Sequence, residues 1–178
     1  DPMPTDNTNH HRQSIRWKNW NYAGGGSYFV TTCSRNRVHL FGKVEATQVV
    51  LSDVGRYVLE TWESMPERFP EMELDAYQVM PNHVHAVLHL NRGVELGDVV
   101  GAFKSLAFKR HYDWLQDSGL LLEVEAKIWQ RNYWEHVIRD EKELHRCRVY
   151  IENNPANWAE DEENLNRLLA RMTERKSR

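Results

Sequence analysis

The chain has 178 residues, long enough to bury a hydrophobic core without disulfide bonds or other cross-links. Its net charge of −3 argues against a protein coated in nucleic acid. The two cysteines, Cys33 and Cys147, match no metal or redox spacing, so we expect both to be free thiols in a reducing compartment. No apolar run is as long as a membrane span, and the first residues lack the core of a signal peptide; we expect one soluble cytoplasmic domain.

The charges are unevenly distributed along the chain. Residues 1–43 carry six Lys and Arg against two acids, whereas residues 45–75 carry eight acids against two Arg. Aromatic residues alternate with the N-terminal bases, a pattern that suits a flexible nucleic-acid strand because the bases can stack while the phosphates are neutralised. Packing of these aromatics on the domain is the alternative. The residues expected to contact DNA are Arg12, Arg16, Trp17, Lys18, Arg35, Arg37 and Lys104.

The first half of the chain predicts a strand followed by a helix. A glycine run at 24–26 precedes residues 27–33, which are rich in β-branched and aromatic residues and indicate a strand. Residues 46–64 place valines and leucines at helical spacing and predict a helix that ends before Pro66.

The next two predicted strands form a hairpin that carries the most informative pair in the sequence. Residues 74–80 and 83–90 are joined by Pro81-Asn82, a pair that suits a tight turn. Alternate residues of a strand share a face, so His83 and His85 are expected to point the same way, opposite to the neighbouring apolar side chains.

Two imidazoles on one pleat can offer neutral ring nitrogens to one divalent cation. The alternative is that His83 and His85 only line a polar sheet face. His89 continues the same face near the end of the strand and is interpreted as structural.

The second half predicts a helix at 95–115, a strand at 130–138, and a helix that starts at Asp140 and ends at Asn153-Asn154-Pro155. The order β-α-β-β-α-β plus a helix is that of an α+β, ferredoxin-like split βαβ fold, with an antiparallel four-stranded sheet and two helices on one face.

The last helix must pack somewhere, and one option is the open face of the sheet, where His83 and His85 project. Tyr150 and Asn154 lie four residues apart, on one side of that helix, and could be presented to the histidines. A metal held by two imidazoles and an amide oxygen, with a phenol beside it, is a nucleophilic site for phosphoryl transfer. Tyr112 and Tyr133 are the alternative nucleophiles.

Three motifs occur in a specific order: Met80-Pro81-Asn82-His83-Val84-His85, then the segment 128–136 (IWQRNYWEH), then Tyr150-Ile151-Glu152-Asn153-Asn154-Pro155. From about Tyr22 to Trp158 the chain resembles the single-tyrosine HUH transposases, and among them the REP-associated tyrosine transposases. The resemblance implies cutting of single-stranded DNA at repetitive extragenic palindromes (REP), which fold into hairpins.

Under this resemblance His83 and His85 are metal ligands, Tyr150 is the nucleophile, and Asn154 takes the position at which insertion-sequence relatives usually carry a glutamine ligand. The resemblance implies Mg²⁺ or Mn²⁺, a 5′-phosphotyrosine intermediate, a monomer, and a cytoplasmic, nucleoid-associated enzyme. The alternative function is that of a module that binds REP hairpins but does not cleave them.

The expected domain, residues 22–158, is flanked by the arm 1–21 and by a charged tail, 159–178. The tail places leucines at helical spacing between acids and bases, so we expect an amphipathic helix. It either packs on the outside of the domain or lies across the DNA-binding face and restrains the enzyme.

Two roles are open for His136. It either contacts DNA or a residue that holds the metal, or it forms a structural hydrogen bond.

Overall fold

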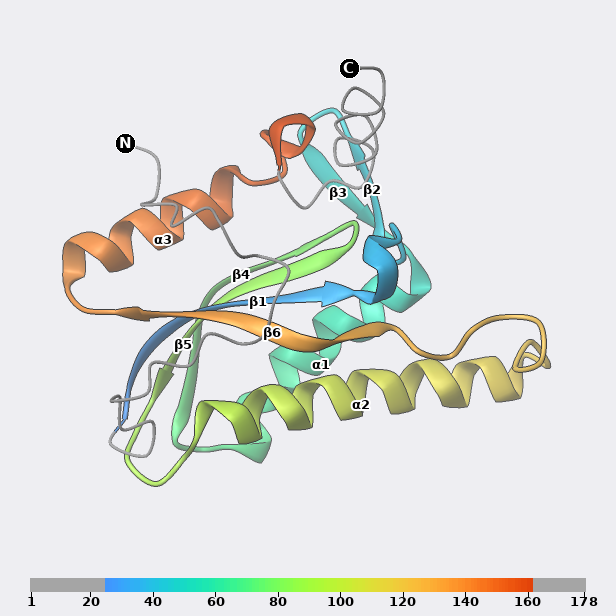
Figure 1. Ribbon diagram of the computed structural model, residues 1–178, viewed down its shortest axis with the longest axis horizontal. Helices are drawn as coiled ribbons and strands as arrows, with labels where there is room; N and C mark the ends of the chain where they lie inside the picture. Colours follow the sequence, from blue (N-terminus) through green and yellow to red (C-terminus); the bar gives the residue numbers. More distant parts are fainter. Residues whose placement is uncertain (1–24, 162–178) are drawn as a thin grey trace, which may run out of the picture.

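The computed structural model describes residues 25–161, and its centre is a four-stranded antiparallel sheet in the order β4-β5-β1-β6 (Figure 1). The sheet combines residues far apart in the sequence, since β1 pairs with both β5 and β6. The predicted α+β architecture is confirmed. The strands are β1 (Gly26–Ser34), β4 (Met72–Met80), β5 (His83–Leu90) and β6 (Trp129–Ile138).

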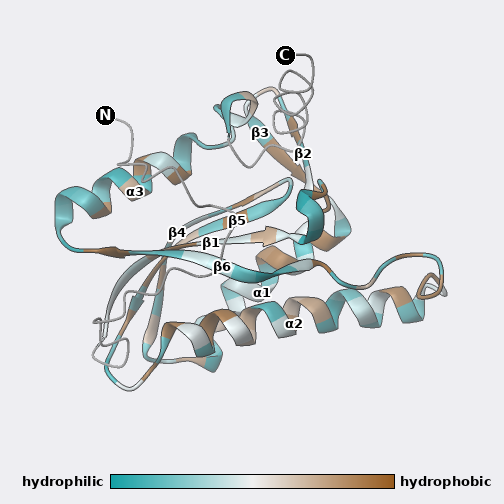
Figure 2. Cartoon of the chain, in the orientation of Figure 1, coloured by the Kyte–Doolittle hydropathy of each residue, from teal (hydrophilic) through white to brown (hydrophobic). Residues whose placement is uncertain are grey.

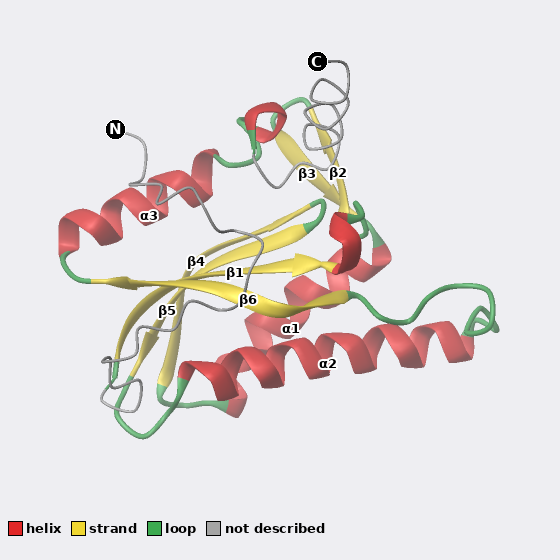
Figure 3. Cartoon of the chain, viewed as in Figure 1, coloured by secondary structure: helices red, strands yellow, loops and turns green. Residues whose placement is uncertain are grey.

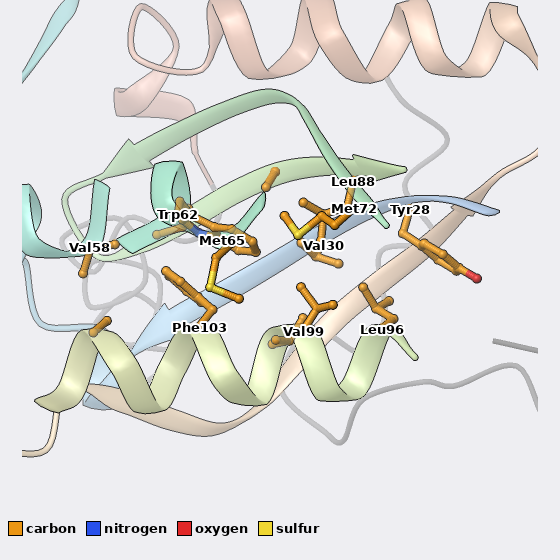
Figure 4. Packing of buried hydrophobic residues seen from close by; sticks show 14 of the residues in the cluster. Tyr28, Val30, Val58, Trp62, Met65, Met72, Leu88, Leu96, Val99 and Phe103 are labelled. Atoms are coloured by element: carbon orange, nitrogen blue, oxygen red, sulfur yellow. The ribbon is translucent and has the colours of Figure 1, made fainter. Parts of the chain in front are cut away.

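Two helices, α1 (Asp53–Arg68) and α2 (Leu96–Asp117), cover one face of the sheet (Figure 3). Their apolar residues and those of the sheet form the main core (Figure 4). Trp62 of α1 stacks on Phe103 of α2 with ring centroids 4.0 Å apart. Because aromatic side chains bury a large apolar area, this pair stabilises the layer of helices against the sheet.

The third helix, α3 (Glu141–Asn153), lies on the opposite face of the sheet, the open face that the sequence left as one option (Figure 1). Asp140 caps it by accepting a hydrogen bond from the backbone N–H of Glu143 at 2.7 Å. Figure 2 colours most of α3 hydrophilic, because only a narrow stripe faces the sheet. That stripe contributes to a second, smaller core of Phe29, Val87, Ile138, Leu144, Cys147 and Ile151.

The alternation along β5 separates the two cores. Its even-numbered residues, Val84, Ala86, Leu88 and Leu90, belong to the main core, whereas Val87 belongs to the core beneath α3. His83 and His85 share the parity of Val87 and therefore face α3. The sheet thus presents both imidazoles to the helix that carries Tyr150.

The prediction of a helix from residue 46 was wrong. Residues 42–51 form a separate two-stranded hairpin of β2 (Gly42–Glu45) and β3 (Gln48–Leu51). Its tight turn holds Ala46 at φ 55°. The helix starts only at Asp53, because the Ser52 hydroxyl caps it by accepting from the N–H of Gly55 at 3.0 Å. Consecutive β-branched residues such as Val49 and Val50 fit a strand at least as well as they fit the apolar stripe of a helix.

The predicted end before Pro66 was also wrong, since α1 continues through Pro66 to Arg68. Pro66 has no N–H to donate to the carbonyl four residues earlier, so its place within the helix must be compensated by packing of the surrounding turn. Trp62 and Met65 are fully buried in the main core, and the N–H of Phe69 donates to the carbonyl of Met65 at 2.9 Å to close the helix.

Several expectations concern residues outside the described range. The arm residues Arg12, Arg16, Trp17 and Lys18 lie there, as does the tail from residue 162 onward. Within the described residues Cys33 and Cys147 are buried free thiols, as predicted. No helix among residues 25–161 has the length and apolarity needed to cross a membrane.

Candidate metal and tyrosine site

The two histidines of β5 meet beneath α3. Their Nε2 atoms are 3.0 Å apart, and His83 is fully buried while His85 is 4% exposed. Tyr150 of α3 lies over His85, with ring centroids 5.3 Å apart. The packing of α3 on this face thus brings Tyr150 into contact with the histidine pair.

Asn82 sets the tautomer of His83. The amide nitrogen of Asn82 donates to the carbonyl of Arg37 at 3.1 Å, so its oxygen is the atom that faces His83 Nδ1 at 2.9 Å. An amide oxygen only accepts hydrogen bonds, so Nδ1 of His83 carries the proton. The lone pair of His83 Nε2 is consequently directed toward His85.

Thr31 of β1 holds the second imidazole in a different way. Its hydroxyl lies 2.8 Å from Nδ1 of His85. A hydroxyl can donate or accept, so Thr31 supports either tautomer of His85. When the hydroxyl accepts, Nε2 of His85 also presents a lone pair, and both imidazoles can bind one ion.

Burial keeps His83 neutral. Desolvation is the main cause that lowers the pKa of His83 to about 3, and the positive charge of Arg37 acts in the same direction. A neutral imidazole is the form that binds metals. His83 is therefore in its ligating form near neutral pH.

A carboxylate and an amide complete the cluster. Asp161 follows the short helix η3 (Trp158–Glu160), and its Oδ2 lies 3.7 Å from His83 Nε2. Asn154, at the C-cap of α3, donates from Nδ2 to the same Oδ2 at 2.7 Å. Ligand atoms of His83, His85 and Asp161 all lie within 4.8 Å of one another.

This donor set fits a divalent cation. Asn154 Oδ1 is buried and accepts no hydrogen bond within residues 25–161, and the side chain of Asp161 is 2% exposed. An ion between these atoms would satisfy the imidazole lone pairs, the amide oxygen and the carboxylate together.

Tyr150 is accessible at the edge of the cluster. It is 37% exposed, while Phe29 packs beside it with ring centroids 5.9 Å apart. Neither alternative nucleophile is near the histidines: Tyr112 lies on α2, across the sheet, and Tyr133 packs against the main core. Among the described tyrosines, Tyr150 is the one in ring contact with His85.

The described residues expected to contact DNA are dispersed. Arg37 is buried close enough to His83 to lower its pKa. Arg35 forms an ion pair with Glu125. Lys104 lies on α2 and donates to the carbonyls of Gln130 and Arg131 at 2.6 and 3.1 Å, so its ammonium covers the edge of β6. Only Arg37 is brought to the cluster.

Three residues of the cluster were not singled out from the sequence. Asp161 belongs to the acidic start of the tail, and its closeness in sequence to the tyrosine helix is its one local signal. In the sequence Asn82 is part of a predicted turn and of the first motif, and Thr31 is part of a predicted strand, but neither position indicates contact with a metal ligand. By contrast, His136 forms the structural hydrogen bond that was one of its two expected roles, to Glu143 at 2.5 Å.

Comparison with known proteins places the chain among transposases. Residues 27–154 match the family described as "Transposase IS200 like". An uncharacterised protein of Haemophilus influenzae is 35% identical over 175 residues, covering 86% of this chain and 93% of the relative. A second protein of that organism, provisionally named a REP-associated tyrosine transposase, is 28% identical and covers 75% of this chain and 72% of its own.

Two solved structures share the fold. One is a REP-associated tyrosine transposase bound to a REP hairpin, with a TM-score of 0.57, 23% identity, and coverage of 80% of this chain and 74% of that one. The other is a Deinococcus radiodurans protein described as a transposase, with a TM-score of 0.51, 18% identity, and coverage of 78% and 95%. Both structures agree with the fold predicted from the order of strands and helices.

Proposed function

This chain belongs to the IS200-like transposase family, and from that premise we propose that it cleaves and rejoins single-stranded DNA hairpins with Tyr150 as the nucleophile. The observation that carries the proposal is the convergence of Tyr150, two buried imidazoles and two oxygen donors beneath one helix. A phenol beside a cation site is the arrangement that phosphoryl transfer requires.

In the proposed reaction the Tyr150 oxygen attacks the scissile phosphorus in line. A bond forms between the phenolic oxygen and phosphorus as the phenol loses its proton to solvent, the bond to the 3′ oxygen breaks, and that oxygen takes up a proton from solvent. The products are a 5′-phosphotyrosine and a free 3′-hydroxyl. Because the aryl phosphodiester conserves the energy of the broken bond, the same site can rejoin strands without ATP.

We propose that His83, His85 and Asn154 hold a divalent metal ion, and that Asp161 contributes a carboxylate oxygen. When bound, the ion polarises the scissile phosphate and stabilises the charge that develops on it. Oxygen donors suit Mg²⁺ and Mn²⁺, and the two imidazoles favour Mn²⁺. Asn82 and Thr31 orient the imidazoles, as partners of metal-bound histidines do.

The proposed substrate is a folded single strand of the REP type. A protein of the same fold is bound to a REP hairpin, and a curated relative carries a REP-associated name. We further propose a monomer, because one chain brings its own tyrosine to its own histidines. Such an enzyme would act in the cytoplasm, at the nucleoid.

The test is the formation of a covalent adduct. A labelled single-stranded REP hairpin incubated with the protein and Mn²⁺ or Mg²⁺ should yield a protein–DNA band on a denaturing gel. The same sequence as a perfect duplex should yield none, and a chelator should suppress the band. Hairpin binding without an adduct under either metal would favour the alternative, a binding module without turnover.

Asp161 provides a separate prediction. Asp161→Asn preserves the shape of the side chain but removes its charge, so Mn²⁺ affinity should fall by about 10- to 100-fold, the range seen when groups around a bound metal are altered. The affinity can be measured by Mn²⁺ titration of the DNA-free protein with electron paramagnetic resonance. Glu160→Gln, at an exposed neighbouring residue, is the control and should bind Mn²⁺ normally. Unchanged affinity in Asp161→Asn would exclude the carboxylate as a ligand.

A further inference from the structure

The tyrosine helix is tied to the edge of the sheet by a fork of hydrogen bonds. Arg148 of α3 donates from Nε to Asp75 Oδ1 at 2.9 Å and from Nη2 to Asp75 Oδ2 at 2.5 Å. Asp75 belongs to β4, the outer strand next to β5. A two-point contact between planar groups restricts orientation as well as distance. Arg148 stands two positions before Tyr150, so this contact holds the turn from which the phenol projects.

A β-bulge directs Asp75 toward the helix. The pairing of β4 with β5 is regular up to Leu74 and resumes at Tyr77, with one extra residue on β4 between them. Leu74 and Tyr77 both pack on the main core, while Ala76 packs on the core beneath α3. Bulges redirect side chains in this way and are common next to functional sites.

Asp75 is itself held by a chain of polar groups across the sheet. His89 Nε2 of β5 lies 2.8 Å from Asp75 Oδ2, and His89 Nδ1 lies 2.6 Å from the hydroxyl of Ser27 on β1. The hydrogen bond from Arg148 is the main cause that lowers the pKa of Asp75 to about 2. The side chain of Asp75 is 11% exposed. His89 therefore has a structural role, as expected: it holds the carboxylate of Asp75, which accepts the hydrogen bonds of Arg148.

The start of α3 has a second polar anchor on the opposite edge strand. Glu143 accepts from the N–H of Arg139 at 2.7 Å and lies 2.5 Å from His136 of β6. The apolar contacts of α3 come from only three buried residues, Leu144, Cys147 and Ile151. Because this apolar stripe is narrow, these two polar anchors add directional contacts that oppose sliding of the helix along the sheet.

We propose that Asp75 and Arg148 form a positioning pair that sets the register of α3 and thereby places Tyr150 for in-line attack. The inference rests on the proposed function. Neither residue touches the reacting atoms; both act through the position of the phenol. A displacement of about 1 Å from the reactive geometry can cost about 10²-fold in rate. A partly exposed ion pair adds little to stability, so the rate is the sensitive measure.

The test uses single-turnover adduct formation at saturating hairpin and Mn²⁺. Asp75→Asn and Arg148→Gln should each slow adduct formation by about 10-fold or more. The loss should not exceed the roughly 10²-fold that a displacement of the nucleophile by about 1 Å can cost. The double variant should be no slower than the slower single variant, because both changes break one contact. Melting temperature, hairpin affinity and Mn²⁺ affinity should stay near those of the unaltered protein.

The matched control is Arg110→Gln. Arg110 pairs with Glu60 on the helical face of the molecule, and its side chain is 41% exposed against 47% for Arg148. This variant should cleave at the normal rate. Normal rates in Asp75→Asn and Arg148→Gln, additive losses in the double variant, or losses matched by lower melting temperature or weaker hairpin binding would each overturn the positioning role.

Failure of this inference can be told apart from failure of the proposed function. Persistent adduct formation after Tyr150→Phe would reject the tyrosine mechanism whatever the pair does. Loss of the adduct in Tyr150→Phe, with normal rates in both pair variants, would reject only the positioning role.

Discussion

Replacing Tyr150 with phenylalanine is expected to abolish cleavage and the covalent adduct while leaving the fold and hairpin binding intact. The change removes one hydroxyl from a side chain that is 37% exposed, so no buried group loses its packing. A phenyl ring has no oxygen to attack phosphorus, and loss of a nucleophile costs several orders of magnitude in rate. We expect at least a ~10³-fold slower reaction, measured as labelled product and adduct under single-turnover conditions.

Tyr112→Phe is the matched control, because Tyr112 is 36% exposed but lies on α2, on the other face of the sheet. It should cleave normally. Normal cleavage by Tyr150→Phe, or loss of cleavage in Tyr112→Phe alone, would remove Tyr150 from the mechanism. Equal melting temperatures and hairpin affinities in the two variants show that the comparison reports chemistry only.

Replacement of His83 or His85 by alanine is expected to stop cleavage and abolish tight Mn²⁺ binding while most hairpin affinity remains. Each imidazole supplies one of the few donors of the cluster, and the neutral state of His83 suits it for ligation. We expect a rate loss of at least ~10²-fold, from the several kcal/mol that a metal ion contributes to charge stabilisation. DNA affinity should come mostly from phosphate contacts elsewhere on the protein.

Alanine leaves a cavity at these buried positions, so glutamine at the same positions serves as a second, bulkier variant. His145→Ala removes an exposed imidazole from α3 and is the control. The measurements are Mn²⁺ titration, hairpin binding at fixed salt, and single-turnover cleavage. Hairpin binding that falls in step with cleavage in both the Ala and Gln variants would show that the pair is structural.

The sequence determined those features of the site that depend on local periodicity. The two-residue period of a strand was enough to place His83 and His85 on one face, and the helical period to place Tyr150 and Asn154 on one side of α3. Element order then indicated the split βαβ sheet, because short connections leave few ways to arrange such elements.

Local propensity failed where two structures compete for the same residues. Val49 and Val50 fit either a helical stripe or a strand, and the choice depends on pairing of β3 with β2 and on the Ser52 cap. Pro66 was expected to end α1, yet the burial of Trp62 and Met65 holds the surrounding turn.

Only the tertiary structure decided which distant residues complete the site. Asp161 reaches the histidines because the chain turns back after α3, and Thr31 does so because β1 pairs with β5. Asp75 meets Arg148 because a bulge in β4 turns it toward the helix. A sequence carries the period of each element, but contacts between elements depend on register and packing, which arise only when the whole chain has folded.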